Sequence, residues 1–152
     1  MRHLMVALVA AVFGLTVQAA AADGPVYVKE GLFGSWDYAL NGYDPVSYFT
    51  DGGPTKGQDD LTYQWNGAEW TFASADNLAA FKENPEKYAP AYGGYCAYAV
   101  SQGGDSGGDP EVWTIHQGRL YLNYSRSVQK KWDQDRDGYI EKADQNWPEA
   151  VQ

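Results

Sequence analysis

Two stretches of the chain alternate apolar and polar side chains with the two-residue period of a β-strand. In the first stretch, Leu61–Trp65 and Glu69–Ala73 flank Asn66-Gly67, a dipeptide that favours a tight hairpin turn. The second stretch is VWTIHQGRLYLNY, which turns near Gln117-Gly118. The sequence therefore predicts two β-hairpins.

Short helices are predicted after each hairpin. Ser74 can cap a helix through SADNLAAFKEN that stops at Asn84-Pro85, and Ser125 or Ser127 can begin another through SVQKKW. A last short helix is predicted over Ile140–Asn146. Two hairpins with several short helices define an α+β fold in a single small domain, and the sequence shows no evident internal repeat.

The N-terminus has the three parts of a secretory signal peptide. Arg2 provides a positive start, Leu4–Val17 is apolar, and small residues follow at Ala19–Ala22. The apolar run is shorter than the roughly 20 residues that a membrane-spanning helix needs. We therefore predict a signal peptide at residues 1–22 and an exported domain at 23–152, most simply in a bacterial periplasm, with no membrane contact after cleavage.

The charge balance excludes some classes of partner. The chain has 20 acidic and 11 basic side chains, and Arg2 is the only one of these in the predicted signal. Nucleic acids and anionic membranes attract positive surfaces, so neither is an expected partner. The sequence contains no phosphate-binding glycine loop, no H-E-x-x-H and no spacing typical of a Ser–His–Asp triad. We therefore predict no organic cofactor and favour a binding module over an enzyme.

Cys96 is the only cysteine in the chain, so an intramolecular disulfide is excluded. Three roles are open to it: a small buried core residue, a reactive thiol, or a metal ligand. The segment YCAYAVSQG can form a short helix with Cys96 in its first turn, where backbone N–H groups stabilise a thiolate and lower its pKa. Any redox cycle needs an external thiol or a partner protein. His116, the only histidine beyond the signal, is either an exposed side chain or a second metal ligand beside Cys96.

The segment DQDRDGYIEKAD has the spacing of a calcium-binding loop. Asp133, Asp135 and Asp137 occupy its first, third and fifth positions, and Gly138 occupies the sixth, where the loop turns sharply. The remaining ligands predicted on this interpretation are Tyr139, Glu141 and Asp144. The alternative is an acidic corner between two helices, in which the aspartates cap helix ends.

Four segments between Asp44 and Pro90 resemble the YHS domain. They are DPV at Asp44–Val46, the pattern Y-x-W-N-G-x-x-W-x-F-x-S at Tyr63–Ser74, Phe81, and NPEKYAP at Asn84–Pro90. The resemblance implies a YHS-like core at 44–90 and a C-terminal extension at 91–152 that carries Cys96. The extension looks like the longer exported branch of the family, some members of which carry selenocysteine at the position of Cys96.

The resemblance also implies metal binding, possibly of copper, through cysteines. The positions at which the family pattern has cysteines are Ser47, Ala73 and Asn77 in this chain. Soft metals such as Cu(I) prefer thiolates, so the family's metal site cannot be transferred to these residues.

These observations lead to one favoured function and two alternatives. We predict an exported metal-binding or accessory module in periplasmic metal and redox homeostasis, centred on Cys96, with copper or zinc as its ion and a metal ion or a redox protein as its partner. The first alternative is a single-cysteine thiol oxidoreductase or peroxide-reducing protein. The second is a structural module stabilised by weakly bound calcium.

Overall fold

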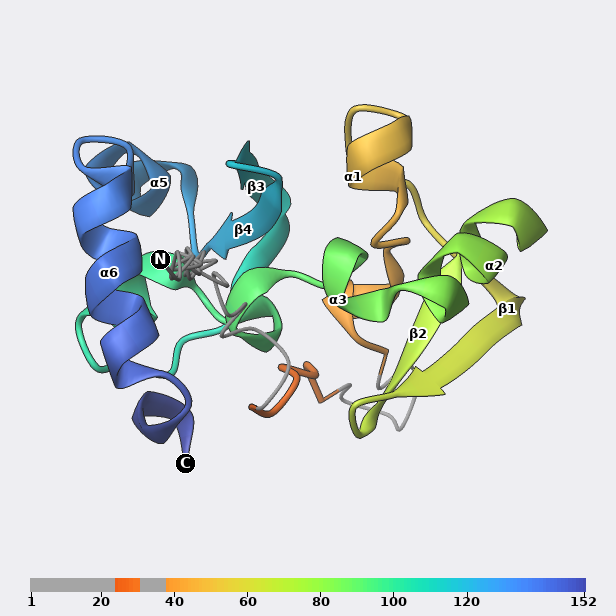
Figure 1. The fold of residues 1–152 in the computed structure, drawn as a ribbon, viewed down its shortest axis with the longest axis horizontal. Helices are drawn as coiled ribbons and strands as arrows, with labels where there is room; N and C mark the ends of the chain where they lie inside the picture. Colours follow the sequence, from red (N-terminus) through yellow and green to blue (C-terminus); the bar gives the residue numbers. More distant parts are fainter. Residues whose placement is uncertain (1–23, 31–37) are drawn as a thin grey trace, which may run out of the picture.

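The computed structural model describes residues 24–30 and 38–152. The predicted signal peptide lies outside the described residues. Within them, the chain forms two separate antiparallel two-stranded sheets surrounded by short helices, as shown in Figure 1. This confirms the predicted α+β fold with two hairpins. None of the helices in the described ranges is long and apolar enough to cross a membrane.

The first half of the described chain contains one hairpin and the helices around it. Its elements are η1 (Leu40–Gly42), α1 (Ser47–Thr50), β1 (Gln58–Trp65), β2 (Ala68–Phe72), α2 (Ala75–Glu83) and α3 (Pro85–Tyr88).

The second half contains the other hairpin and the longest helix of the described residues, α6. Its elements are η2 (Ala91–Gly94), α4 (Ala97–Ser101), β3 (Asp109–His116), β4 (Arg119–Asn123), α5 (Arg126–Trp132), α6 (Arg136–Asn146) and η3 (Glu149–Val151).

Both hairpins turn through two residues with positive φ. The pairs are Asn66-Gly67, with φ of 49° and 75°, and Gln117-Gly118, with φ of 50° and 78°. Positive φ at both central residues is the type I′ geometry that matches the twist of the flanking strands. A serine then caps the next helix, because Ser74 Oγ accepts from Asn77 N and Ser125 Oγ accepts from Val128 N. The pattern-based predictions of both hairpins and both caps are confirmed.

The two halves repeat the same unit, which we call unit 1 (residues 41–83) and unit 2 (residues 93–132). The hairpin registers correspond pair by pair, including a bulge at the same place. Gln58 pairs with Phe72 and Trp65 with Ala68 in unit 1, as Asp109 pairs with Asn123 and His116 with Arg119 in unit 2. The repeat is not evident in the sequence, because it is carried by backbone geometry that few identical residues accompany.

The loops that precede the hairpins also correspond. Asp44 N donates to Thr55 O at 2.8 Å, and Cys96 N donates to Ser106 O at 2.8 Å. A further bond of 2.9 Å joins Gly57 N to Gly42 O in unit 1, and its counterpart in unit 2, also 2.9 Å, joins Gly108 N to Gly94 O. The segments NGYDPVS and GGYCAYA are thus equivalent, and Cys96 occupies in unit 2 the position of Asp44 in unit 1.

Strand β4 separates two hydrophobic cores. Leu120 and Leu122 pack with the core of unit 1, which includes Trp70 and Phe81, while Tyr121 between them packs into a second core with Ala91, Tyr92, Ala97, Val100, Trp132, Ala143 and Trp147. This is the alternation of a strand that is buried on both faces. Because one strand contributes to both cores, the extension is packed against the YHS-like core.

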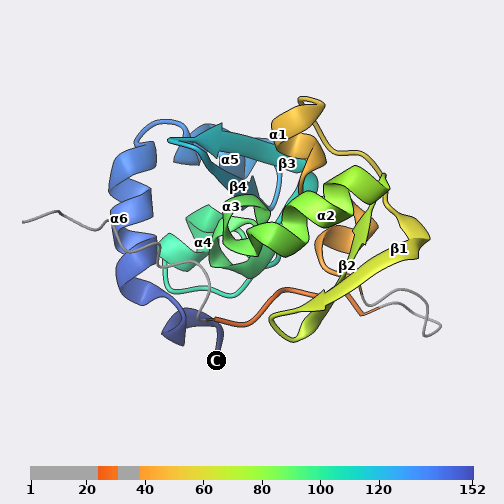
Figure 2. The same cartoon turned by 45° about the vertical axis from the view of Figure 1, so that its right-hand side comes forward.

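The segment 24–30 runs along both halves, as Figure 2 shows. Tyr27 N donates to Gly93 O at 2.9 Å, and Asn66 Nδ2 donates to Gly24 O at 3.0 Å. Val28 also forms an antiparallel bridge with Ala39. The segment therefore fastens the hairpin of unit 1 to the start of unit 2.

Candidate functional site

A fully buried carboxylate lies at the centre of unit 1. Asp44 Oδ1 accepts from Val46 N at 2.8 Å, and its Oδ2 accepts from Ala73 N at 2.8 Å and from Asn77 Nδ2 at 2.7 Å. The side chain is 0% exposed. Three N–H donors therefore replace the water that the buried anion has lost.

The positions expected to carry thiolates in a YHS domain all contact this aspartate. Ala73 and Asn77 bind its carboxylate, and Ser47 Oγ donates to its backbone oxygen at 2.7 Å. All three residues act toward Asp44 as hydrogen-bond donors. A soft metal instead needs the lone pairs of sulfur ligands. No group of three or more His, Cys, Asp or Glu side chains suited to a metal occurs among the described residues. The residues of unit 1 therefore do not fit the family's metal.

Cys96 is the N-cap residue of α4 and its side chain is 1% exposed. Its Sγ accepts from Ala99 N at 3.5 Å and from Tyr124 N at 3.2 Å, and donates to Asn123 Oδ1 at 3.6 Å. The contact with Tyr124 N corresponds to the contact of Ala73 N with Asp44 in unit 1. Cys96 is therefore buried, as one of its three predicted roles requires, and its sulfur also lies among polar groups.

Burial determines the protonation of Cys96. Loss of solvent raises the pKa of the thiol above its usual value of 9.0, and the N–H groups of Ala99, Tyr124 and Tyr98 lower it by less. The expectation that the helix start lowers this pKa is wrong, because desolvation outweighs the donors. Cys96 is a protonated thiol at neutral pH.

Asn123 is the polar partner that the sequence did not reveal. It is 0% exposed, and its Oδ1 accepts from Tyr98 N at 3.2 Å as well as from the thiol. Its Nδ2 is buried and has no hydrogen-bond partner. The equivalent residue in unit 1 is Phe72. The signal in the sequence was an asparagine directly after the apolar run Leu120–Leu122.

Tyr124, whose backbone N–H binds the sulfur, also lines a groove of about 490 Å³. Its lining includes Tyr27, Lys29, Asn41, Asp109, Tyr124 and the Gly107-Gly108 pair. Tyr124 connects the sulfur with the groove. Its backbone N–H donates to Cys96 Sγ, and its side chain is 63% exposed.

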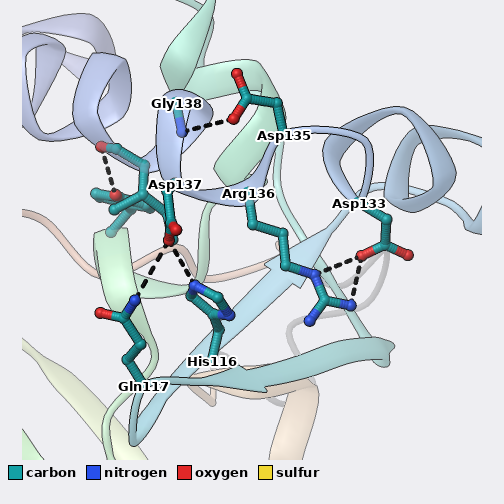
Figure 3. Close-up of polar contacts among 9 residues, drawn as sticks. His116, Gln117, Asp133, Asp135, Arg136, Asp137 and Gly138 are labelled. Atoms are coloured by element: carbon teal, nitrogen blue, oxygen red, sulfur yellow. Dashed lines mark hydrogen bonds and ion pairs between the residues drawn. The ribbon is translucent and has the colours of Figure 1, made fainter.

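His116 lies at the turn of the second hairpin, whereas Cys96 lies beside the end of β4 that is farther from the turn. Its Nε2 is 2.7 Å from Asp137 Oδ1, and Gln117 Nε2 donates to the same oxygen at 3.4 Å, as Figure 3 shows. Cys96 forms a bridge with Leu122, whereas His116 pairs with Arg119 at the turn. Three residues of extended strand span about 10 Å, so the structure does not bring the two predicted ligands together.

The predicted calcium loop is not a loop in the structure. Asp133 accepts from Arg136 Nε at 2.9 Å, and Asp135 caps α6 by accepting from Gly138 N at 3.1 Å, as Figure 3 shows. Helix α6 begins at Arg136, so Asp137 and Gly138 are already helical. The segment forms an acidic corner between helices α5 and α6 and does not adopt the conformation of a calcium loop. This corner was the alternative interpretation of the sequence.

The other residues assigned to this loop lie along α6 and do not converge. The ring of Tyr139 packs against Tyr98 with centroids 5.1 Å apart, and Glu141 is exposed. Asp144 accepts from the phenol of Tyr92 at 2.8 Å. Helical geometry therefore points these groups in different directions.

Comparison with known proteins supports the resemblance over unit 1. Residues 46–92 match the family model of the YHS domain, so this chain contains a YHS domain. No curated protein and no solved structure matches the chain. The matched range covers most of unit 1 and ends before Cys96.

Proposed function

We propose that this YHS-domain protein is an exported accessory module of periplasmic metal and redox homeostasis, and that Cys96 is the group through which it acts. The observation that carries this proposal is the environment of the sulfur. Cys96 Sγ lies between two backbone N–H donors and the amide of Asn123, and one of the donors belongs to Tyr124, which lines a groove.

The donors favour the form of the sulfur that binds a metal. N–H groups directed at sulfur stabilise the thiolate, and a soft cation binds that thiolate in exchange for the proton. Copper in its Cu(I) state and zinc are the candidate ions, since both bind thiolates. The raised pKa of the thiol means that uptake of the ion competes with a proton. Affinity should therefore rise with pH across the neutral range.

The YHS domain supports an accessory role. Its family association with metal agrees with a binding function, while unit 1 has no thiolate left to bind the ion. The predicted signal peptide supports export. A metal ion held through Cys96 needs further ligands, which a partner protein or solvent can supply.

Metal titration of the mature protein tests this function. The protein is purified reduced and without chelators, and Cu(I), Zn(II) and Ca(II) are titrated separately into wild type and Cys96→Ser. We expect binding of Cu(I) or Zn(II) that is lost in the variant. His116→Ala is the matched control and should bind as wild type does. Equal, negligible binding of both ions to wild type and Cys96→Ser would rule out the metal function.

The second candidate is a thiol redox function at the same atom. The same two N–H donors favour it, because the thiolate is also the form that attacks peroxides and disulfides. Without a second cysteine in the chain, turnover requires an external thiol or a redox partner protein. Thiol-dependent consumption of hydrogen peroxide by wild type but not by Cys96→Ser would support this candidate.

A further inference from the structure

We infer that Cys96 is an oxidative modification site whose stable end state is a sulfinate, an anion that takes in unit 2 the place that the Asp44 carboxylate has in unit 1. Metal binding is not needed for this role, so it goes beyond the function proposed above. It rests on the equivalence of the two units and on the unpaired amide of Asn123.

The two sites have corresponding donors. Ala73 N binds the carboxylate of Asp44, and its counterpart Tyr124 N binds the sulfur of Cys96. The second pair of equivalent donors, Val46 N and Tyr98 N, binds different acceptors in the two units. Val46 N donates to Asp44 Oδ1, whereas Tyr98 N donates to Asn123 Oδ1. The carboxylate of Asp44 has two oxygens for its donors, whereas Cys96 has a single sulfur, and the amide oxygen of Asn123 accepts from Tyr98 N.

A second observation shows that the site of unit 2 is incomplete with a thiol in it. Asn123 Nδ2 is fully buried and unpaired, and a buried donor without an acceptor destabilises the folded state. In unit 1 a third donor, Asn77 Nδ2, binds the carboxylate, although it comes from helix α2 and not from the position equivalent to Asn123. An oxygen added to Cys96 would supply acceptors for Tyr98 N and, after rotation of the amide, for Asn123 Nδ2.

The chemistry requires two equivalents of a hydroperoxide. In the first step the sulfur attacks one peroxide oxygen, an S–O bond forms and the O–O bond breaks. The other oxygen leaves as an alcohol or water with the thiol proton, and a sulfenic acid remains. A second hydroperoxide oxidises the sulfenic acid in the same way to a sulfinic acid, which loses its proton. Each step oxidises sulfur by two electrons and reduces one O–O bond.

A sulfinate resembles a carboxylate in its charge and in its two acceptor oxygens, although it is pyramidal and the carboxylate is planar. In both groups one negative charge is shared by two oxygens on an atom bonded to Cβ. A site that holds Asp44 in unit 1 with three N–H donors should hold the oxidised cysteine in unit 2 in the same way. The modified protein should therefore be at least as stable as the reduced one.

Two matched variants test the preference for an anion without any oxidation. Cys96→Asp and Cys96→Asn have nearly the same shape and differ in charge and in donor character. We expect a higher melting temperature for Cys96→Asp than for Cys96→Asn. A melting temperature of Cys96→Asn equal to or above that of Cys96→Asp would overturn the inference.

Peroxide treatment tests the modification itself. The chain is exposed to hydrogen peroxide, and the mass and melting temperature are followed in wild type, Cys96→Asp and Asn123→Ala. Both methionines of the chain, Met1 and Met5, lie in the predicted signal, so the mature protein has no competing thioether.

We expect wild type to gain two oxygen atoms on the peptide that contains Cys96 and to keep or raise its melting temperature. Asn123→Ala should lose that gain in stability, and Cys96→Asp should stay unmodified. A thiol that remains reduced while the denatured chain is oxidised would contradict the inference, as would a sulfinate that lowers the melting temperature. Neither result depends on the metal titration, so the two proposals fail separately.

Discussion

The phenol of Tyr92 donates a hydrogen bond of 2.8 Å to the carboxylate of Asp144 and joins the turn before unit 2 to helix α6. Tyr92 is fully buried and has a φ of 56°. Burial, followed by the nearby charge of Asp144, raises the pKa of this phenol, so it remains a donor at any ordinary pH.

Removal of that phenol should destabilise the protein. Tyr92→Phe keeps the ring and loses a bond to a charged acceptor, which is worth about 1.5–3 kcal/mol. Urea denaturation should show this decrease in the free energy of unfolding. In a double-mutant cycle with Asp144→Ala the two effects should not add, because each variant removes the same contact. Additive effects would show that the two side chains contribute separately.

Calcium should not raise the melting temperature. The loop proposed from DQDRDGYIEKAD needs a closing carboxylate from Asp144, which is bonded to Tyr92, and a turn at Gly138, which is inside α6. Thermal melts in millimolar calcium and in EDTA should coincide. A ligand that binds only the folded state stabilises it in proportion to the logarithm of its concentration. A calcium-dependent rise that disappears in Asp137→Asn would restore the calcium interpretation.

The local structure of this protein follows from its sequence wherever short-range chemistry decides it. Asn66-Gly67 and Gln117-Gly118 predicted both hairpins, and Ser74 and Ser125 cap the helices that follow. The helix start at Cys96 was also predicted correctly. Turn and cap preferences act within four residues, so they can be recognised in a single sequence.

The candidate site depended on contacts that the sequence does not show. Asn123 is distant from Cys96 in the sequence, and only the pairing of β4 with the loop before α4 brings them together. The lower pKa expected for Cys96 came from the helix start alone, whereas burial comes from the whole fold. The repeat was missed for the same reason, since equivalent positions such as Asp44 and Cys96 differ in chemistry.

The carboxylate of Asp44 should be essential for the stability of unit 1. Asp44→Asn replaces a charged acceptor with an amide whose NH₂ group faces other donors, Ala73 N and Asn77 Nδ2. We expect a loss of about 3 kcal/mol or more, because buried donors then lack an acceptor. Asn77→Ala removes one donor and leaves the carboxylate bound to backbone, so its loss should be smaller. Equal losses in the two variants would contradict the central role of the charge.

The two hairpin turns should respond alike to the same substitution. Gly67 and Gly118 have φ of 75° and 78°, and no heavy atom lies within 4 Å of a Cβ built at either position. The cost of alanine is therefore backbone strain alone, about 1–2 kcal/mol at each turn. Chemical denaturation of Gly67→Ala and Gly118→Ala should give similar losses. A large loss at one turn only would show that the two turns are not equivalent.

Alkaline pH should unfold the protein gradually through its buried phenols and its thiol. Burial is the largest cause that raises the pKa of Tyr48, Tyr92 and Tyr121, and it raises the pKa of Cys96 from a usual value of 9.0. The folded state therefore favours the protonated forms, while the unfolded chain ionises at the usual values.

Stability should be greatest below about pH 9, and it should fall as the pH rises from there toward the raised pKa values of the folded state. Denaturation by urea at a series of pH values measures this fall. In Cys96→Ser the early part of the fall should disappear, while the later part, which comes from the tyrosines, should persist. A free energy of unfolding that stays constant from pH 8 to above pH 10 would show that these groups ionise equally in the folded and unfolded chains.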